Sequence, residues 1–323
     1  MYVVPEKEID GLMTRADAFK AVEAVFGAMA RGDAYNFPVI REAIGHADAL
    51  YGFKSGFDRA GLTLGVKSGG YWPGNAEKGI PNHQSTVFLF DPDTGRLHAT
   101  VGGNLLTALR TAAAAAISVH YLARRDAKVL GMIGAGHQAK FQLRAVAEQR
   151  AFEKVVAWNR PEDAHMLDGL AAVADEIGLP FESVSVAELG AQADVIVTVT
   201  SSFDAILKDE HVTPGTHVTC MGTDTKGKQE VAAELVARAT CFTDEVAQSI
   251  SLGECQHAHA VGTKAEEAIT EIGKVINGDH QGRTSDEEVT LFDGTGVGLQ
   301  DLAVASAVVG RAVEKGVAIE VDF

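Results

Sequence analysis

One segment, residues 129–142 with the sequence VLGMIGAGHQAKFQ, constrains the fold of this chain more than any other. An apolar run typical of a β-strand ends at Ile133, and Gly134, Gly136 and Ala139 then follow in GxGxxA spacing. The first glycine permits a tight turn, the second lets backbone N–H groups approach a pyrophosphate, and the alanine lets a helix pack closely on the sheet. A helix N-terminus also carries partial positive charge that favours phosphate. The pattern therefore predicts a Rossmann domain that binds NAD or NADP.

The chain on both sides of this fingerprint supports an α/β fold with a doubly wound parallel sheet. From residue 127 to about 300, strand-like and helix-like segments alternate, which is typical of such a sheet. The expected strands are KVLGMI, KVVAWN, ADVIVTVT, THVTCMG and ATCFTDE, and the clearest helices are AKFQLRAVAEQ and residues 161–177. A strand, a glycine-rich turn and a final helix end the chain, and that helix or the tail VAIEVDF could return to the first domain.

The first third of the chain has a different pattern, which predicts an α+β domain with a largely antiparallel sheet. Residues 14–31 have helical spacing of apolar side chains, with Thr14 as the N-cap. TVFLFDPDTGRLHATV predicts a hairpin with its turn at DPDTG, and a second helix is expected from Thr107 to about Arg124. We expect a substrate-binding and dimerisation domain at residues 1–117 and 305–323, and the Rossmann domain at 118–304.

Composition excludes several other classes of protein. The net charge of −16 and the lack of Lys/Arg runs argue against nucleic acid and membrane surfaces as partners. No signal peptide or membrane span is expected, and three scattered cysteines fit a cytoplasmic protein without a disulfide framework. Cys255, His257 and His259 form CxHxH, but this spacing suits a strand and no second cluster completes a metal site. We therefore expect no metal.

Two charged residues stand where chemistry is plausible. Arg110 falls in the first turn of the helix that Thr107 would cap, where a cation opposes the helix dipole, so an anion facing it would explain the position. A surface arginine that tolerates a small penalty explains it equally well. Asp224 in MGTDTKGKQE follows an expected parallel strand, at the sheet edge where ligands bind, and is a candidate proton donor or acceptor. The alternative is an ordinary turn aspartate.

Three further cations are candidates for binding anions. Arg41 and Lys67 each lie near a β-like run of the first domain, and glycines beside Lys67 permit close ligand approach. Asn159 and Arg160 end the second Rossmann strand, where an acidic residue would select NAD. No acid stands at that point, and Arg160 could pair with the 2′-phosphate of NADP. For each cation the alternative is a solvated side chain.

Four motifs together resemble the ornithine cyclodeaminase/mu-crystallin family: LLTALRTAAAAA, GAGHQA, MGTDTKGKQE and DGTGVGLQDLAVA. Their order and spacing fit across nearly the whole chain. The resemblance implies a homodimer formed through the first domain, with the C-terminal segment completing that domain. It also implies that Arg41, Lys67 and Arg110 hold a substrate carboxylate, and that Asp224 is the catalytic acid/base with Lys67 as the other catalytic residue.

The resemblance also places residues at the cofactor. Lys228 and Thr295 match positions near the nicotinamide, although serine is commoner than threonine at the latter. The expected cofactor-binding set is Gly134, Ala135, Gly136, His137, Gln138, Ala139, Asn159, Arg160, Thr200, Ser201, Lys228 and Thr295. The resemblance favours NAD(H), whereas Arg160 taken alone favours NADP(H).

Hydride exchange between a nicotinamide and an α-imino acid is the activity that the resemblance implies. Within the family, the resemblance of DAYNFPVIREAIGHADALYGFKSGFD and GGYWPGN is to members that reduce iminosuccinate to L-aspartate, so the resemblance implies this reaction. The candidates for binding a second carboxylate are His46, Lys54, Tyr71, His83 and Gln84. The alternatives are ornithine cyclodeaminase, alanine dehydrogenase or ketimine reductase activity, and, from another class, a nucleotide-regulated binding protein for small ligands.

Overall fold

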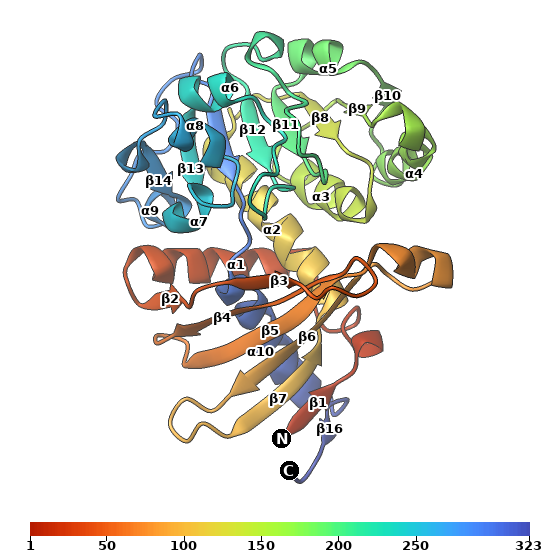
Figure 1. The fold of residues 1–323 in the computed structure, drawn as a ribbon, viewed down its shortest axis with the longest axis vertical. Helices are drawn as coiled ribbons and strands as arrows, with labels where there is room; N and C mark the ends of the chain where they lie inside the picture. Colours follow the sequence, from red (N-terminus) through yellow and green to blue (C-terminus); the bar gives the residue numbers. More distant parts are fainter. The chain divides into compact units, whose positions relative to one another are not determined.

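The computed structural model describes all of residues 1–323, which form two compact units (Figure 1). The first comprises Met1–Arg110 and Val297–Phe323, and the second comprises Thr111–Gly296. Both boundaries lie earlier than the expected 117/118 and 304/305. The second boundary lies before residue 304 because helix α10 (Gly298–Glu314) packs on the first sheet, so the whole helix belongs to the first unit.

The first unit is built on a mostly antiparallel sheet, as expected. Its strands follow the order β16-β1-β7-β6-β5-β4-β2, with β3 paired to β4. Only β1 and β7 run parallel. The tail strand β16 pairs with β1, so both the last helix and the tail return to this unit. The strands are β1 (Tyr2–Val4), β2 (Ala34–Asn36), β3 (Ile40–Ala43), β4 (Leu50–Asp58), β5 (Thr63–Tyr71), β6 (His83–Phe90), β7 (Leu97–Gly102) and β16 (Ile319–Glu320).

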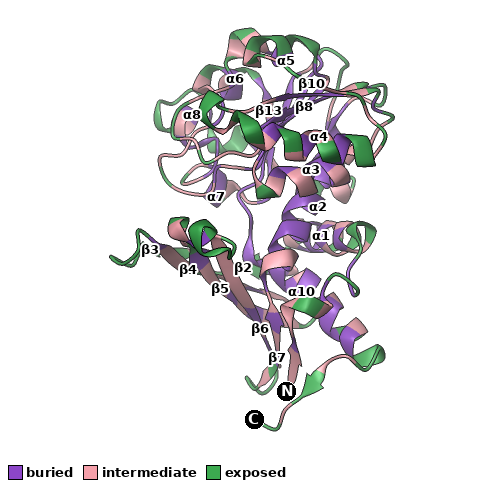
Figure 2. Ribbon diagram, turned by 90° about the vertical axis from the view of Figure 1, so that its right-hand side faces the viewer, coloured by how far each residue is buried: buried purple, intermediate pink, exposed green.

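Two long helices lie on one side of this sheet (Figure 2). Helix α1 (Arg15–Ala30) begins with the expected cap at Thr14, whose side chain forms a capping box with Asp17. Helix α10 contacts α1 as well as strands β4, β5 and β6. Short 3-10 turns η1 (Glu6–Glu8) and η2 (Pro73–Lys78) complete the unit. The expected hairpin is confirmed as β6 and β7, joined through Asp91–Gly95.

Helix α2 (Asn104–Leu122) corrects one expectation about its start. It begins at Asn104, and the carboxylate of Glu6 accepts hydrogen bonds from the backbone N–H of Asn104 (3.1 Å) and Leu105 (2.6 Å). Thr107 is therefore not the cap, and Arg110 lies in the second turn. The cap could not be found from local sequence because Glu6 is 98 residues away.

The second unit is the expected doubly wound sheet, and all of its eight strands are parallel. Their order is β10-β9-β8-β11-β12-β15-β13-β14. The strands are β8 (Val129–Ile133), β9 (Lys154–Trp158), β10 (Phe181–Ser183), β11 (Val195–Thr198), β12 (His217–Cys220), β13 (Thr240–Thr243), β14 (Ile269–Glu271) and β15 (Thr290–Asp293). The central strands β8, β11, β12 and β15 are buried at every position except Val129, as expected of a parallel sheet that is covered on both faces.

The helices of this unit are mostly short. They are α3 (His137–Ala147), α4 (Leu167–Glu176), α5 (Val186–Gln192), α6 (Ala233–Arg238), α7 (Val246–Ser249), α8 (Gln256–Ala260) and α9 (Ile272–Ile276), with 3-10 turns η3 (Pro161–Met166), η4 (Asp209–His211) and η5 (Glu266–Ala268). The segment expected as one helix over 161–177 is thus a 3-10 turn followed by α4, with non-helical backbone at Asp163.

The CxHxH segment corrects a second expectation, because it lies at helix α8 and not in a strand. His257 donates through Nε2 to the carbonyl of Lys228 (3.0 Å), and His259 donates through Nδ1 to that of Lys264 (3.1 Å). The structure contains no group of three or more His, Cys, Asp or Glu side chains placed to hold a metal ion.

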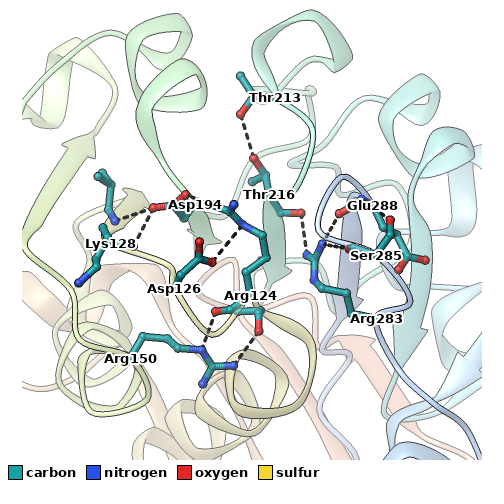
Figure 3. A network of polar contacts seen from close by, with 12 residues as sticks. Arg124, Asp126, Lys128, Arg150, Asp194, Thr213, Thr216, Arg283, Ser285 and Glu288 are labelled. Atoms are coloured by element: carbon teal, nitrogen blue, oxygen red, sulfur yellow. Dashed lines mark hydrogen bonds and ion pairs between the residues drawn. The ribbon is translucent and has the colours of Figure 1, made fainter.

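Arginine side chains bind the C-terminal end of α2 within the second unit, and Figure 3 shows Arg150 at the carbonyl of Arg124, just beyond this helix. Arg150 donates to the carbonyls of Val119, Ala123 and Arg124 at 2.7–2.8 Å, and Arg283 donates to that of Leu122 at 2.7 Å. Cations there satisfy the last carbonyls and oppose the negative end of the helix dipole.

By length and composition, α2 is the one helix apolar enough to cross a membrane. However, 83% of its most apolar window is buried inside the protein, which explains its alanine-rich, apolar sequence.

Candidate functional site

The fingerprint has the expected geometry. Strand β8 ends at Ile133, Gly134 turns the chain with φ +100°, and Gly136 is the N-cap of α3. A Cβ on Gly134 would lie 2.7 Å from the carbonyl oxygen of Val199, so this position requires glycine for packing as well as for its backbone conformation. A Cβ on Gly136 would meet nothing within 4 Å. Space for a close ligand is therefore left open at the second glycine, beside a helix N-terminus.

A cleft of about 350 Å³ opens at this turn. Its lining residues come from the fingerprint, from α3 and from the segment around η3: Ala135, Gly136, His137, Lys140, His165, Met166 and Gly169. The one side chain among them that carries a fixed positive charge is Lys140, in the first turn of α3. Cation, helix N-terminus and open glycine together suit a phosphate-bearing ligand.

Two alanine substitutions separate the two roles of these glycines. We expect Gly136→Ala to fold with an unchanged melting temperature but to bind NADH about tenfold more weakly, because its methyl group occupies the space where a pyrophosphate approaches. We expect Gly134→Ala to be unfolded or strongly destabilised, because of the strained φ and the contact with Val199. Thermal unfolding and fluorescence titration with NADH measure both effects. Equal NADH affinity in Gly136→Ala would refute the assignment.

The carboxyl ends of three neighbouring strands meet beside the fingerprint. A Cβ on Gly134 would lie 2.9 Å from Cγ2 of Thr200, which follows β11. One on Gly222, which follows β12, would lie 2.3 Å from the carbonyl oxygen of Thr200. Thr200 therefore lies between the fingerprint and the loop that carries Asp224, as expected of a cofactor-binding position. Its neighbour Ser201 is exposed.

Asp224 and Lys228 form an ion pair in that loop. Lys228 Nζ lies 2.9 Å from Asp224 Oδ1 and also donates to the carbonyl of Gly222 at 3.2 Å. Both side chains are partly exposed, at 30% and 19%. The structure thus brings together the expected acid/base and the expected nicotinamide-side lysine, and leaves both accessible to a ligand.

Two buried glutamates that the sequence analysis missed hold the ends of this loop. Glu230 accepts from the Gly222 N–H (2.9 Å), and Glu254 accepts from the N–H groups of Glu230 (2.9 Å) and Val231 (2.7 Å) and from the Thr223 hydroxyl. Burial, followed by the charge of Glu230, raises the pKa of Glu254 to about 8. A carboxyl two residues beyond the KGK sequence was the only signal available for Glu230.

Thr295 is buried and is held by the carboxylate of Asp244. Its hydroxyl donates to Asp244 Oδ1 at 2.6 Å, while its own N–H and that of Gly296 donate to the same carboxylate at 3.1 and 2.8 Å. Asp244, another residue that the sequence analysis missed, thereby fixes the glycine-rich turn between β15 and α10. The extra methyl group of threonine is accommodated, since Thr295 is only 1% exposed.

Arg160 forms ion pairs with acidic residues that follow it in the chain. Its Nε contacts Asp163 and lies 3.7 Å from Glu162. Asn159 donates through Nδ2 to the carbonyl of Asp163 at 2.8 Å, which holds this turn against the end of β9. No acidic residue stands at the end of strand β9 itself, as the sequence analysis noted. Glu162 and Asp163, two and three residues beyond Arg160, are the acids that pair with it.

The first unit contains the residues that were expected to bind the substrate carboxylate. Lys67 on β5 and Arg110 on α2 both bind Asp301 of α10: Lys67 Nζ lies 2.8 Å from Oδ2, and Arg110 Nε lies 3.1 Å from Oδ1. Gln300 accepts from Arg110 Nη1 at 2.9 Å, and Thr107 accepts from Lys67 at 3.4 Å. Asp301 is fully buried and the two cations are each 6% exposed. Arg110 does face an anion, although it lies in the second turn of α2 and not in the first turn, on which that expectation rested.

Burial shapes the charges of this cluster. It lowers the pKa of Lys67 to about 7, with Asp301 opposing and Arg110 and Lys54 adding to the shift. Burial also lowers the pKa of His83 to about 4, assisted by Lys67, Arg110 and Arg41. Arg41 of β3 is thus near the same group. His83 is neutral near pH 7 and can serve as a hydrogen-bond donor.

Asp301 and Gln300 were not identified as site residues from the sequence. The sequence signal that could have identified Asp301 was its position, an acid in the first turn of a helix whose face is otherwise apolar. An acid there is stabilised by the helix dipole, so helix formation alone could have explained it. Only the meeting of α10 with β5 and α2 shows that Asp301 compensates two cations.

Comparisons with known proteins show the family to which the chain belongs. A model of the ornithine cyclodeaminase/mu-crystallin family matches residues 2–316. The chain is 65% identical to iminosuccinate reductase from Paracoccus denitrificans (strain Pd 1222), over 100% of both proteins.

Solved structures show the same similarity. The crystal structure of the Paracoccus denitrificans iminosuccinate reductase in complex with NAD+ superposes with a TM-score of 0.95, covering 100% of this chain and 99% of that one at 65% identity. An archaeal alanine dehydrogenase dimer with bound NAD superposes at 0.93, covering 100% and 99% at 32% identity.

Proposed function

Because the chain belongs to the ornithine cyclodeaminase/mu-crystallin family, we propose that it reduces iminosuccinate to L-aspartate with NADH. The chain is an NAD(P)-dependent oxidoreductase that acts on imines. The observation that carries the choice of substrate is the 65% identity to the Paracoccus enzyme over the whole of both chains. In the proposed reaction, iminosuccinate, NADH and one proton give L-aspartate and NAD+.

Lys67, Arg110 and Arg41 are proposed to hold the substrate carboxylate. A guanidinium binds a carboxylate in bidentate fashion, and the buried location of Lys67 and Arg110 strengthens the attraction. Asp301 holds both side chains in place before substrate binds. Fixing the imino acid in this way converts the reaction into an effectively intramolecular step.

The second unit has the features needed to hold the dinucleotide. The open position at Gly136, the N-terminus of α3 and Lys140 suit the pyrophosphate, and Thr200, Lys228 and Thr295 are proposed to lie toward the nicotinamide. When bound, NADH supplies the hydride that reduces the imine carbon.

Asp224 is proposed to supply the proton on the imine nitrogen. A protonated imine is the stronger electrophile, so a positioned acid accelerates its reduction. Lys228, 2.9 Å from Asp224, holds the carboxyl in place. The glutamates that fix both ends of the loop restrict its movement, and so support a defined position for Asp224.

We propose a preference for NADH over NADPH, supported by the pairing of Arg160. Its guanidinium is already compensated by Asp163 and Glu162, and these acids would repel a 2′-phosphate. The related structures contain NAD+ or NAD.

Replacing Asp163 with asparagine tests this preference. We expect the ratio of kcat/KM for NADH over that for NADPH to fall about threefold, since an exposed ion pair of this kind is worth roughly 0.2–1 kcal/mol. Asp175→Asn makes the same change at an exposed position near the C-terminal end of α4 and should leave the ratio unchanged. Wild-type rates that are equal with both coenzymes would contradict the proposal.

A homodimer in the cytoplasm is also proposed. The sheet face of the first unit opposite α10 bears exposed apolar side chains, among them Tyr35 (45%), Ile40 (53%) and Phe53 (39%), and a face of this kind is typical of an interface. The related alanine dehydrogenase is a dimer. The three cysteines are free thiols, as in cytoplasmic proteins.

The direct test is NADH oxidation by the purified protein with freshly generated iminosuccinate, made from oxaloacetate and ammonia. Pyruvate with ammonia and NADPH are run in parallel, and ornithine with NAD+ tests cyclodeaminase activity. We expect fast oxidation with the four-carbon substrate only. Faster turnover of pyruvate with ammonia would assign the chain to alanine dehydrogenation, and NAD(H) binding without any turnover would favour a binding protein.

A further inference from the structure

Iminosuccinate carries two carboxylates, and the roles assigned so far account for one. The inference that follows rests on the proposed function and concerns the second carboxylate. The charges of Lys54, Arg110 and Asp301 all act on Lys67, so Lys54 lies near the cations that are proposed to hold the first carboxylate.

The register of the sheet places Lys54 beside Lys67. Residues directly opposite each other on antiparallel strands share a face, and Lys54 on β4 is directly opposite Lys67 on β5. The two ammonium side chains therefore project from the same face of the sheet.

The next pair on the same face has no side chains to fill the space. Gly52 lies opposite Gly69, and on the other side of β4, Gly52 is opposite Arg41 of β3. Arg41, Lys54 and Lys67 thus project from one face within two rungs of the ladder, and glycines lie between them.

The shared face is the one on which α10 packs. The preceding pair on this face is Gly56 opposite Gly65, and Cβ atoms there would lie 3.0 Å from Leu299 and 2.8 Å from Leu302. Lys54 therefore projects to the same side of the sheet as Asp301, the partner of Lys67. The charge of Lys54 also contributes to lowering the pKa of Asp301 and that of Lys67.

We propose that Lys54 binds the second carboxylate of the substrate and so selects a dicarboxylic imino acid. The Cβ atoms of directly opposite residues are roughly 5 Å apart. Two carbons separate the carboxyl groups of iminosuccinate, so ammonium groups on adjacent strands can each reach one. A diamino acid would instead bring its side-chain ammonium against Lys54, which excludes ornithine.

The test compares two substrates in three proteins. Lys54→Met removes the charge and keeps the length of the side chain; Lys20→Met makes the same change on the exposed surface of α1. For iminosuccinate we expect kcat/KM to fall about 10- to 100-fold in Lys54→Met, mainly through KM, as for a lost charged hydrogen bond. For pyruvate with ammonia we expect less than a threefold change, and Lys20→Met should match wild type with both.

A fall of the same size with both substrates would overturn the proposal, because Lys54 would then serve the carboxylate that both share. Lys54→Arg should retain much of the preference for the four-carbon substrate, and its complete loss there would count equally against the proposal. Unchanged NADH affinity and melting temperature verify that each variant folds.

The proposed function and the proposed role of Lys54 can be disproved separately. If the wild type does not turn over iminosuccinate, that function is wrong, and binding then decides the role of Lys54. Calorimetry of L-aspartate and L-alanine in the presence of NAD+ should show tighter binding of aspartate that disappears in Lys54→Met. Equal affinity of the wild type for the two amino acids would overturn the assignment.

Discussion

Asp224→Asn is expected to lower kcat about a thousandfold while leaving the dissociation constant of NADH within about twofold, since a positioned general acid contributes roughly 10²–10⁴ to the rate. Asparagine keeps the size and can still accept from Lys228, but it cannot deliver a proton to the imine nitrogen. Steady-state NADH oxidation with iminosuccinate measures kcat, and fluorescence titration measures NADH binding.

The control for this variant is Asp204→Asn, the same change at an exposed position of the same unit. It should match wild type in both measurements. Asp224→Asn with kcat within tenfold of wild type would remove Asp224 from the proton-transfer role. A parallel loss of NADH affinity would instead indicate that Asp224 acts by positioning Lys228 or its loop.

Asp301→Asn is expected to destabilise the protein by about 3 kcal/mol at slightly acidic pH, because it leaves Lys67 and Arg110 as buried cations without an acid. The side chain keeps its size, so the loss reports charge and not a cavity. Urea unfolding monitored by circular dichroism gives the free energy of unfolding.

The pH dependence of this loss has a definite sign. Arg110 and Lys67 lower the pKa of Asp301 despite the opposing effect of burial, so its carboxylate stabilises the folded protein above the ordinary aspartate pKa and the effect is lost only in acid. Lys67 has a pKa of about 7, and without Asp301 that pKa falls further. At higher pH the variant contains a neutral Lys67 and fewer unpaired charges.

We therefore expect a larger difference in unfolding free energy between wild type and Asp301→Asn at about pH 5.5 than at about pH 8.5. Asp209→Asn breaks the exposed pair with Arg238 and should cost less than about 1 kcal/mol at either pH. A loss that is equal at both pH values would show that Asp301 does not compensate the charge of Lys67.

Local pattern was sufficient for most of the fold. The fingerprint strand β8 and the capped helix α1 lie where periodicity and capping chemistry predicted them, because each depends on neighbours in the chain. The hairpin of β6 and β7 follows for the same reason. The start of α2 was not predicted correctly, because this helix is capped by the distant Glu6.

The sequence by itself determined the Rossmann architecture and the family, because these depend on motifs with fixed local spacing, and it identified Lys67, Arg110 and Asp224 as candidate site residues. Only the tertiary structure decided their partners. Asp301 reaches Arg110 across 191 residues, and Glu254 reaches the Thr223 hydroxyl across 31. The compensation of a buried charge depends on which elements pack together, and one chain gives no local signal of that packing. The facing lysines of β4 and β5 likewise became visible only through strand register.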